Sequence, residues 1–200
     1  MTAPHTHDAP NGLPANGLPK HEFLAGRIAL DFCNSLSRMR RVGPPDRILK
    51  PADFQGWAGR CGFVLERAPS PQALVRLHAL RAALFGIFDA LRDARDPTAA
   101  DLEVLNAELT EARAAERLVP ARAGYAIEDA APAIIDRFRH AVVRDAAGLL
   151  IGDRRRIKRC PRHDCLWLFY DSSKNLSRRW CAMDDCGTLE KVQRYRKRAE

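Results

Sequence analysis

The chain has 200 residues, of which 46% are hydrophobic and 29% are charged. This composition is typical of a soluble globular protein with one core and room for a small appended module. No apolar run approaches the roughly 20 residues that cross a bilayer, so we expect no membrane association. The first residues lack the basic start and apolar stretch of a secretory signal, and the expected location is therefore cytoplasmic.

The positive charge is concentrated near the C-terminal end. Residues 151–200 hold 14 of the 33 Lys and Arg but only 7 of the 25 Asp and Glu. This segment therefore has a net charge of +7, and the whole chain has a net charge of +8. Clustered positive charge attracts phosphate groups, which favours a polyanionic partner for this segment. A solvated basic tail is the alternative, and charge alone leaves both open.

Taken in chain order, residues 1–20 contain four Pro and two Gly, and we expect them to form a disordered leader. Residues 21–150 then predict a helix-rich domain. Two short elements, Ile28–Cys33 and Asp53–Trp57, have helical patterns. Ser70 and Pro71 indicate an N-cap followed by the first residue of a longer helix.

Further along this domain, Thr98 indicates another N-cap, in a capping box with Asp101. Two short apolar stretches around Gly124, within residues 117–129, predict a small β-hairpin. Pro132 is expected to open the last helix of the domain. The fold class predicted for the whole chain is therefore mainly α with minor β (α+β).

Four cysteines near the C-terminal end, Cys160, Cys165, Cys181 and Cys186, have the spacing C-x4-C-x15-C-x4-C. Two close thiolate pairs separated by a longer insert suit a tetrahedral zinc ion. Disulfides are the alternative, which a reducing cytoplasm disfavours. Four thiolates close the coordination shell, so we expect one structural ion. His163, between the first two cysteines, is interpreted as a solvent-facing loop residue.

The insert predicts how residues 154–200 fold around the metal. Leu166–Tyr170 is a β-prone run, Asp171–Asn175 is a turn cluster, and Arg178–Trp180 is expected to be the returning strand. A helix from Gly187 to about Arg198 follows. A hairpin and then a helix that supplies a ligand is a treble-clef-like arrangement, and metal binding should stabilise so small a module.

The final helix is strongly basic, and Val192 and Tyr195 are expected to face the zinc module. A basic helix anchored by zinc is suited to a phosphate backbone or a major groove. The alternative is a solvated helix end, where positive charge also favours the helix dipole. The candidate nucleic-acid-binding residues are Arg178, Arg179, Lys191, Arg194, Arg196 and Arg198.

Three motifs resemble the CGNR zinc-finger family. The first is the cysteine pattern, and the second is Trp167-Leu168-Phe169-Tyr170-Asp171 with Arg178-Arg179-Trp180-Cys181 and Cys186-Gly187. The third, Leu30-Asp31-Phe32-Cys33-Asn34-Ser35, resembles an early motif of the helix-rich ABATE domain that precedes the finger in these bacterial proteins. The resemblance spans roughly residues 22–198 and is most specific in the last forty.

The resemblance implies that the four cysteines bind zinc and that the finger binds DNA. It also implies a stress-induced transcription regulator, a role assigned to the family largely by inference. Thr188 and Leu189 stand where the family has Asn and Arg. Arginine is the commonest reader of guanine edges, so this exchange predicts weaker sequence discrimination rather than loss of phosphate affinity.

These observations favour a zinc-binding regulator that binds DNA, with residues 21–150 sensing a small-molecule effector or forming a homodimer. A zinc-stabilised module for protein or RNA interaction is the alternative. Asp31 and Asn34 are candidate ligand-binding residues, with a local capping network as the other interpretation. No phosphate loop, nucleophile elbow or metal-binding His pair appears, and we expect no enzyme activity.

Overall fold

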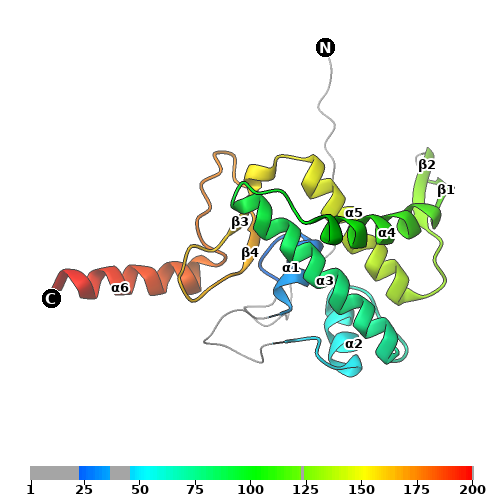
Figure 1. Cartoon of the computed structure of the whole chain (residues 1–200), viewed down its shortest axis with the longest axis horizontal. Helices are drawn as coiled ribbons and strands as arrows, with labels where there is room; N and C mark the ends of the chain where they lie inside the picture. Colours follow the sequence, from blue (N-terminus) through cyan, green and yellow to red (C-terminus); the bar gives the residue numbers. More distant parts are fainter. Residues whose placement is uncertain (1–22, 37–45, 123, 200) are drawn as a thin grey trace, which may run out of the picture.

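The computed structural model describes residues 23–36, 46–122 and 124–199, without the side chains of Arg194 and residues 197–199. The predicted leader, residues 1–20, lies outside the described residues. The helices are α1 (Ile28–Asn34), α2 (Pro51–Arg60), α3 (Pro71–Arg92), α4 (Ala99–Ala114), α5 (Ile134–Ile151) and α6 (Thr188–Ala199), with short helical turns η1 (Arg154–Arg156) and η2 (Met183–Gly187) (Figure 1). The strands are β1 (Glu116–Ala121), β2 (Gly124–Asp129), β3 (Ile157–Arg159) and β4 (Leu168–Tyr170).

The strands form two separate antiparallel pairs. β1 pairs with β2, which confirms the hairpin predicted around Gly124, and β3 pairs with β4. Helices dominate the rest of the described chain, so the α+β class is confirmed. Each described helix is too short or too polar to cross a bilayer.

The predicted helix starts are confirmed by their caps. Ser70 Oγ accepts a hydrogen bond from Ala73 N at 3.2 Å, and Thr98 Oγ1 accepts one from Asp101 N at 3.1 Å. The capping box of Thr98 and Asp101 differs from the usual one in one detail. The Asp101 carboxylate accepts a hydrogen bond from the Thr98 hydroxyl at 2.8 Å rather than from the Thr98 backbone N–H. Side-chain length alone does not explain this, because Asp53 at the same position of α2 accepts from the Lys50 backbone N–H at 3.0 Å.

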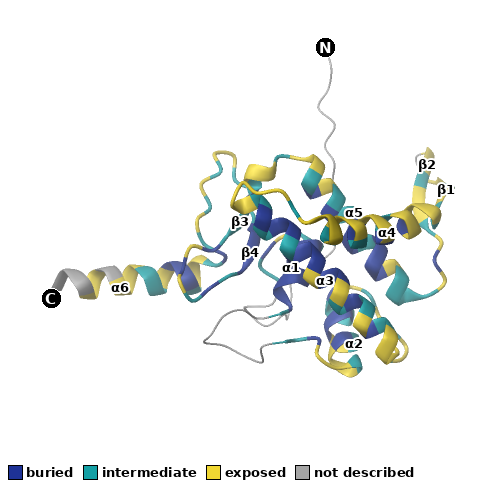
Figure 2. Ribbon diagram, in the orientation of Figure 1, coloured by how far each residue is buried: buried dark blue, intermediate teal, exposed yellow. Residues whose placement is uncertain are grey.

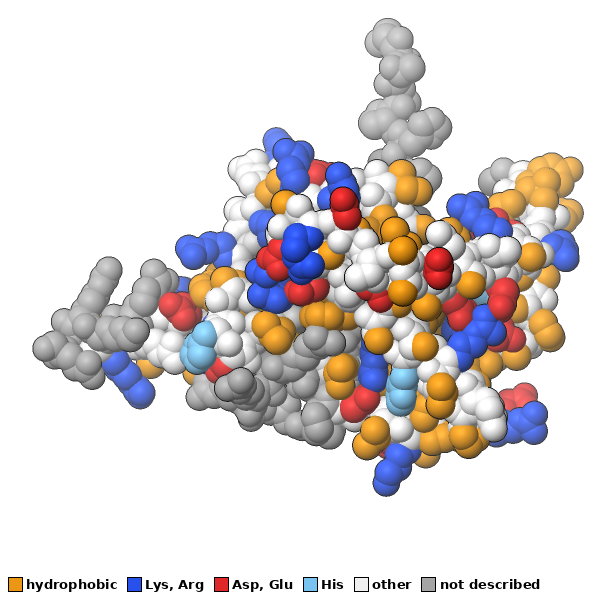
Figure 3. Space-filling model, viewed as in Figure 1, with side chains coloured by type: hydrophobic (Ala, Val, Ile, Leu, Met, Phe, Trp, Pro, Cys, Tyr) orange, Lys and Arg blue, Asp and Glu red, His pale blue; other side chains and the backbone are white. Residues whose placement is uncertain are grey.

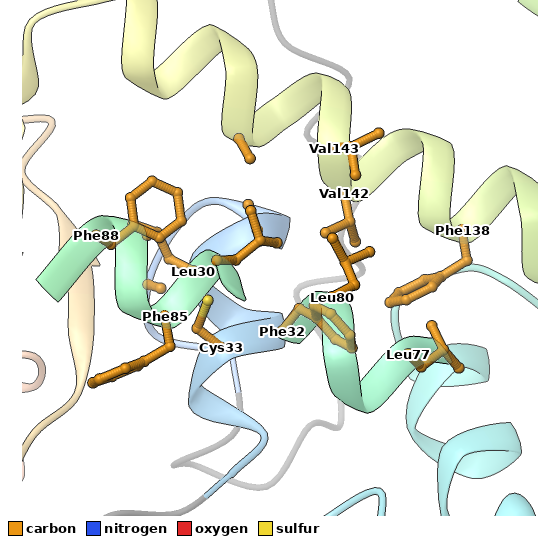
Figure 4. Packing of buried hydrophobic residues seen from close by; sticks show 14 of the residues in the cluster. Leu30, Phe32, Cys33, Leu77, Leu80, Phe85, Phe88, Phe138, Val142 and Val143 are labelled. Atoms are coloured by element: carbon orange, nitrogen blue, oxygen red, sulfur yellow. The ribbon is translucent and has the colours of Figure 1, made fainter. Parts of the chain in front are cut away.

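The main core lies where α1 crosses between α3 and α5. Figure 4 shows Leu30 and Phe32 of α1 beside Leu80 of α3 and Val142 of α5, and these side chains are fully buried. The ring of Phe138 lies near the centre. Its contacts with Phe32, Phe54, Trp57 and Phe63 have centroid distances of 5.2–5.8 Å and steep interplanar angles. Such edge-to-face contacts add to the stabilisation from burial.

The β3–β4 pair lies on the same core, although it belongs to the C-terminal segment. Ile157 of β3 and Leu168 of β4 are buried with residues of α1 and α3. Figure 2 shows the buried colour on β4 and on most of α1. Cys33 and Cys61 lie in this core too, as small buried side chains. The zinc-binding segment is therefore continuous with the helical region rather than linked to it by an open tether.

Candidate metal centre and nucleic-acid interface

The four predicted cysteines meet in one buried cluster. Cys160 follows β3, Cys165 precedes β4, Cys181 precedes η2, and Cys186 lies within η2. Their sulfur atoms all lie within 4.8 Å of one another, with Sγ–Sγ distances of 3.7 Å for Cys165–Cys181 and 3.6 Å for Cys181–Cys186. His163 is exposed, as expected for a loop residue.

These distances fit a tetrahedral metal site. Sulfurs about 2.3 Å from a central zinc ion lie about 3.8 Å apart, whereas a disulfide brings them to about 2.05 Å. Mutual hydrogen bonding lowers the pKa of Cys160 and raises the pKa of Cys181, because thiol protons stabilise one thiolate at the expense of the next. A divalent cation at the centre would stabilise all four thiolates together. The donor set is closed, which suits a structural ion.

A small apolar shell surrounds the cysteines. Trp167 and Phe169 are buried against them, and Trp180 packs at the edge. A Cβ on Gly187 would lie 3.2 Å from Trp180 Cδ1 and closer still to the Met183 sulfur, so glycine permits this close approach. The guanidinium of Arg47 lies 5.2 Å from the Trp167 ring centroid. This shell and the metal together form the module's core.

Arg178 has a structural role, which corrects its prediction as a nucleic-acid contact. Its guanidinium donates to the backbone carbonyls of Leu24 at 2.7 Å, Tyr170 at 3.1 Å, Trp180 at 3.1 Å and Cys181 at 2.6 Å. It also lies 4.6 Å from the Phe169 ring centroid. With its donors used in this way, Arg178 fastens the zinc module to the N-terminal region and offers little to a phosphate.

The predicted returning strand at residues 178–180 is wrong. β4 pairs with β3 along its whole length, and its other edge contacts the N-terminal region. Tyr170 N donates to Ala25 O at 2.9 Å, and Leu168 N donates to Asn34 Oδ1 at 2.9 Å. Both edges of β4 are therefore taken, and residues 178–180 cannot add a strand.

Asn34 also donates from Nδ2 to Leu168 O at 2.8 Å, so its amide pairs with β4 as a neighbouring strand would. Asp31 Oδ1 accepts from Ala25 N at 2.9 Å. Asp31 and Asn34 are only 1% and 3% exposed, which makes them unreachable for a ligand in this conformation. The structure thus gives the predicted ligand-binding pair a structural role. The Asp31 contact is local, whereas the Asn34 contacts join segments 134 positions apart.

Asp31 is an unusual carboxyl group. Burial raises its pKa to about 7, and its Oδ2 is a buried atom without a hydrogen-bond partner in the described structure. The pKa of Asp171 is shifted in the opposite direction. Although burial alone would raise the pKa of Asp171, hydrogen bonds from Lys158 at 2.6 Å and from Ser173 hold it well below its usual range.

α6 projects from the zinc module, with only its start in contact with η2 (Figure 1). Val192 is 41% exposed and Tyr195 is 77% exposed, which corrects the expectation that they face the module. Lys191 and Arg196, two of the candidate nucleic-acid-binding residues, are exposed, and so is Arg179, two positions before Cys181. The side chains of Arg194 and Arg198 lie outside the described part of the structure. α6 therefore presents a basic surface that is open to a partner.

A second basic feature was missed at the sequence level. Residues 154–159 read Arg-Arg-Arg-Ile-Lys-Arg, and they form η1 and β3 immediately before Cys160. This run contributes to the net positive charge of residues 151–200, but the sequence analysis does not predict that it forms a basic surface. A signal was present, because five cations in six residues is a denser cluster than the one on α6.

The comparisons with known proteins agree with this organisation. Residues 26–153 match the ABATE family model, described as "Putative stress-induced transcription regulator", and residues 156–199 match the CGNR zinc finger model. No curated protein matches the chain significantly. The four clustered cysteines lie within the finger match, and they form the site of one structural zinc ion. The chain belongs to the ABATE family and ends in a CGNR zinc finger.

Proposed function

We propose that this protein regulates transcription by binding duplex DNA through α6, which the zinc site holds in place. The observation that carries the proposal is the isolation of α6. Its described side chains at 191–193, 195 and 196 are all exposed, and it is a helix of 12 residues. A helix of this length is marginally stable without tertiary packing, and its exposed cations Lys191 and Arg196 suit a partner of opposite charge.

The zinc supports this function structurally. Cys186 lies two residues before α6 begins, so the metal fixes the helix at its N-terminal end. With four thiolates the ion has no open position for a substrate, which supports a binding protein rather than a metalloenzyme. Thr188 Oγ1 donates to Met183 O at 3.1 Å, so this residue, which stands where the family has Asn, links the start of α6 to η2.

Fluorescence polarisation of labelled random duplex DNA with the zinc-loaded full chain tests this function. We expect binding at low salt that weakens steeply near physiological salt, because released counterions contribute to affinity. The double variant Lys191→Ala/Arg196→Ala should bind more weakly. The matched control is Arg67→Ala/Arg122→Ala, which removes two exposed arginines far from the finger and should bind as the wild type does.

The results distinguish the alternatives. Absence of binding at low salt would contradict the proposal. Stronger binding to single-stranded RNA than to duplex DNA would favour the RNA-interaction alternative, because A-form and single-stranded targets are recognised differently. Equal binding by the α6 variant and its control would remove α6 from the interface.

A second role, homodimerisation, is favoured by the β1–β2 hairpin. Leu118, Tyr125 and Ile127 on this hairpin are 66%, 73% and 61% exposed. Leu118 and Ile127 are cross-strand partners, so they form one apolar face. A dimer would place two copies of α6 on one duplex. Light scattering on Ile127→Lys beside the wild type tests this role, and a monomeric wild type would contradict it.

A further inference from the structure

A groove of about 750 Å³ lies between the end of α3 and the zinc module. Leu91, Ile157 and Leu166 give it an apolar floor. Lys and Arg side chains from α3, from residues 154–162 and from residues 178–179 surround that floor, and no Asp or Glu is among the described residues that line it. Figure 3 shows blue side chains, with red ones among them, where α3 ends and β3 begins.

Some of these cations are paired with carboxylates that do not line the groove. Lys158 contacts the buried Asp171 at 2.6 Å, and Arg159 contacts Asp89 at 2.8 Å. Arg162 pairs with Asp164 at 2.6 Å, and its side chain is 2% exposed. These three pairs shape the wall and leave little charge for a ligand.

Three other arginines are available. Arg154 is exposed and has no ion pair in the part of the chain that the structure describes. Arg155 pairs with Asp153 at 2.8 Å, but its side chain is 78% exposed, and a phosphate can replace the carboxylate in so weak a pair. Arg179 is exposed, with its guanidinium 5.7 Å from the Trp180 ring centroid.

We propose that this groove binds the sugar–phosphate backbone of the same DNA that α6 contacts. Guanidinium groups bind phosphate oxygens in pairs of parallel hydrogen bonds, and an apolar floor suits the carbon faces of the sugars. The proposal rests on the proposed function, because it extends the interface from α6 to a second surface of the same module.

The zinc site makes simultaneous contact possible. Cys160 and Cys165 line the groove, while Cys186 precedes α6. Since the sulfurs of all four cysteines lie within 4.8 Å of one another, one ion holds the groove and the start of α6 in a constant relation. A rigid pair of contacts fixes the orientation of the protein on the duplex, as backbone contacts generally do.

The test uses the zinc-loaded full chain with three groove arginines removed, Arg154→Ala/Arg155→Ala/Arg179→Ala. Polarisation with random duplex DNA is measured over a series of salt concentrations. We expect binding at least about tenfold weaker and a salt slope lower by about three, because each lost phosphate contact lowers the slope by about one. The loss should be uniform across sequences.

The matched control removes three exposed arginines outside the finger, Arg67→Ala/Arg113→Ala/Arg122→Ala, and should keep the wild-type affinity and slope. Zinc content and far-UV circular dichroism establish that both proteins are folded. A third arm adds inorganic phosphate to the wild-type complex at constant ionic strength.

The outcomes separate this inference from the proposed function. If the groove variant matches its control while the α6 variant binds weakly, the groove proposal is wrong and the function stands. If the wild type binds no DNA, both fail. If the groove variant alone binds weakly, the groove is supported and α6 is removed from the interface. Displacement of DNA by low inorganic phosphate would overturn the backbone proposal and assign the groove to a small anionic ligand.

Discussion

Single residues in this protein show how burial changes the role of a charged group. Arg178 and Arg179 are neighbours in a basic cluster, yet one donates to four carbonyls and the other is exposed. The difference lies in which side chain the folded chain surrounds with acceptors. Adjacent arginines therefore serve structure and binding separately.

Arg178→Ala should destabilise the protein by on the order of 3 kcal/mol, because it removes charged hydrogen bonds and leaves buried carbonyls without a donor. Urea unfolding followed by tryptophan fluorescence measures this. Arg179→Ala is the control and should change the free energy of unfolding by less than about 0.5 kcal/mol. Equal effects of the two substitutions would contradict the role assigned to Arg178.

The buried carboxyl group of Asp31 should make the stability of the protein depend on pH. The pKa of this carboxyl group is about 7 in the folded protein, against an ordinary value of 3.8. Between these values the folded state binds more protons than the unfolded state, so this residue lowers stability as pH rises from about 4 to about 7. Below both values it has no such effect.

Asp31→Asn keeps an oxygen for Ala25 N and removes the ionisation. We expect the variant to be more stable than the wild type at pH 7, with a difference that shrinks as pH falls towards 5. Thermal unfolding at several pH values measures it. A constant difference over this range would show that Asp31 does not ionise there.

At the level of elements, the helices of the N-terminal region are joined by a buried ion network as well as by apolar packing. Glu108 of α4 is 4% exposed and accepts from Arg76 of α3 at 2.5 Å and from Arg139 of α5 at 2.8 Å. Hydrogen bonds from Arg76 hold the pKa of the more exposed Glu111 below its usual value. The two carboxylates thus share the same two arginines.

Removing Glu108 leaves Arg139 buried with less compensation, so Glu108→Ala should cost about 3 kcal/mol of stability. Glu111→Ala is the control. Its side chain is 50% exposed, and the expected loss is below about 1 kcal/mol. Chemical denaturation compares the two variants. A smaller loss for Glu108→Ala than for Glu111→Ala would contradict the assignment of the network to the core.

α6 gives the second prediction at this level. Because little packs against it, its amide hydrogens should exchange rapidly in the free protein. Bound DNA should slow exchange at residues 188–199, and hydrogen exchange with mass spectrometry measures the change. Exchange that is slow without DNA would mean that α6 needs no partner.

For the whole molecule, the zinc module and the helical region share a core. Ile157 and Leu168 belong to the main core, while Arg178 and Asn34 carry hydrogen bonds between the two regions. We therefore expect cooperative unfolding rather than two independent transitions, even though two family models divide the chain.

Chelation of zinc tests this coupling. Without the ion, four crowded thiols have no central cation to hold them together, and residues 171–199 should lose their order. The N-terminal helices should remain folded with a lower melting temperature, because β3 and β4 lose part of their support. Calorimetry with and without chelator measures the shift. An unchanged melting temperature of the helical region would show that the regions are uncoupled, and Cys181→Ser should reproduce the chelated state.

The sequence alone determined the local features. The cysteine spacing predicted the metal site, Ser70 and Thr98 predicted helix starts, and Gly124 predicted a hairpin, because each depends on residues close together in the chain. The family motifs added the organisation of the chain.

Tertiary structure decided the rest. Asn34 pairs with Leu168 across 134 positions, which removes the edge of β4 that residues 178–180 were predicted to fill. The same packing buries Asp31 and directs Arg178 to carbonyls. The basic groove likewise combines α3 with the segment before Cys160. Such contacts depend on which surfaces meet after folding, and no pattern of neighbouring residues specifies that.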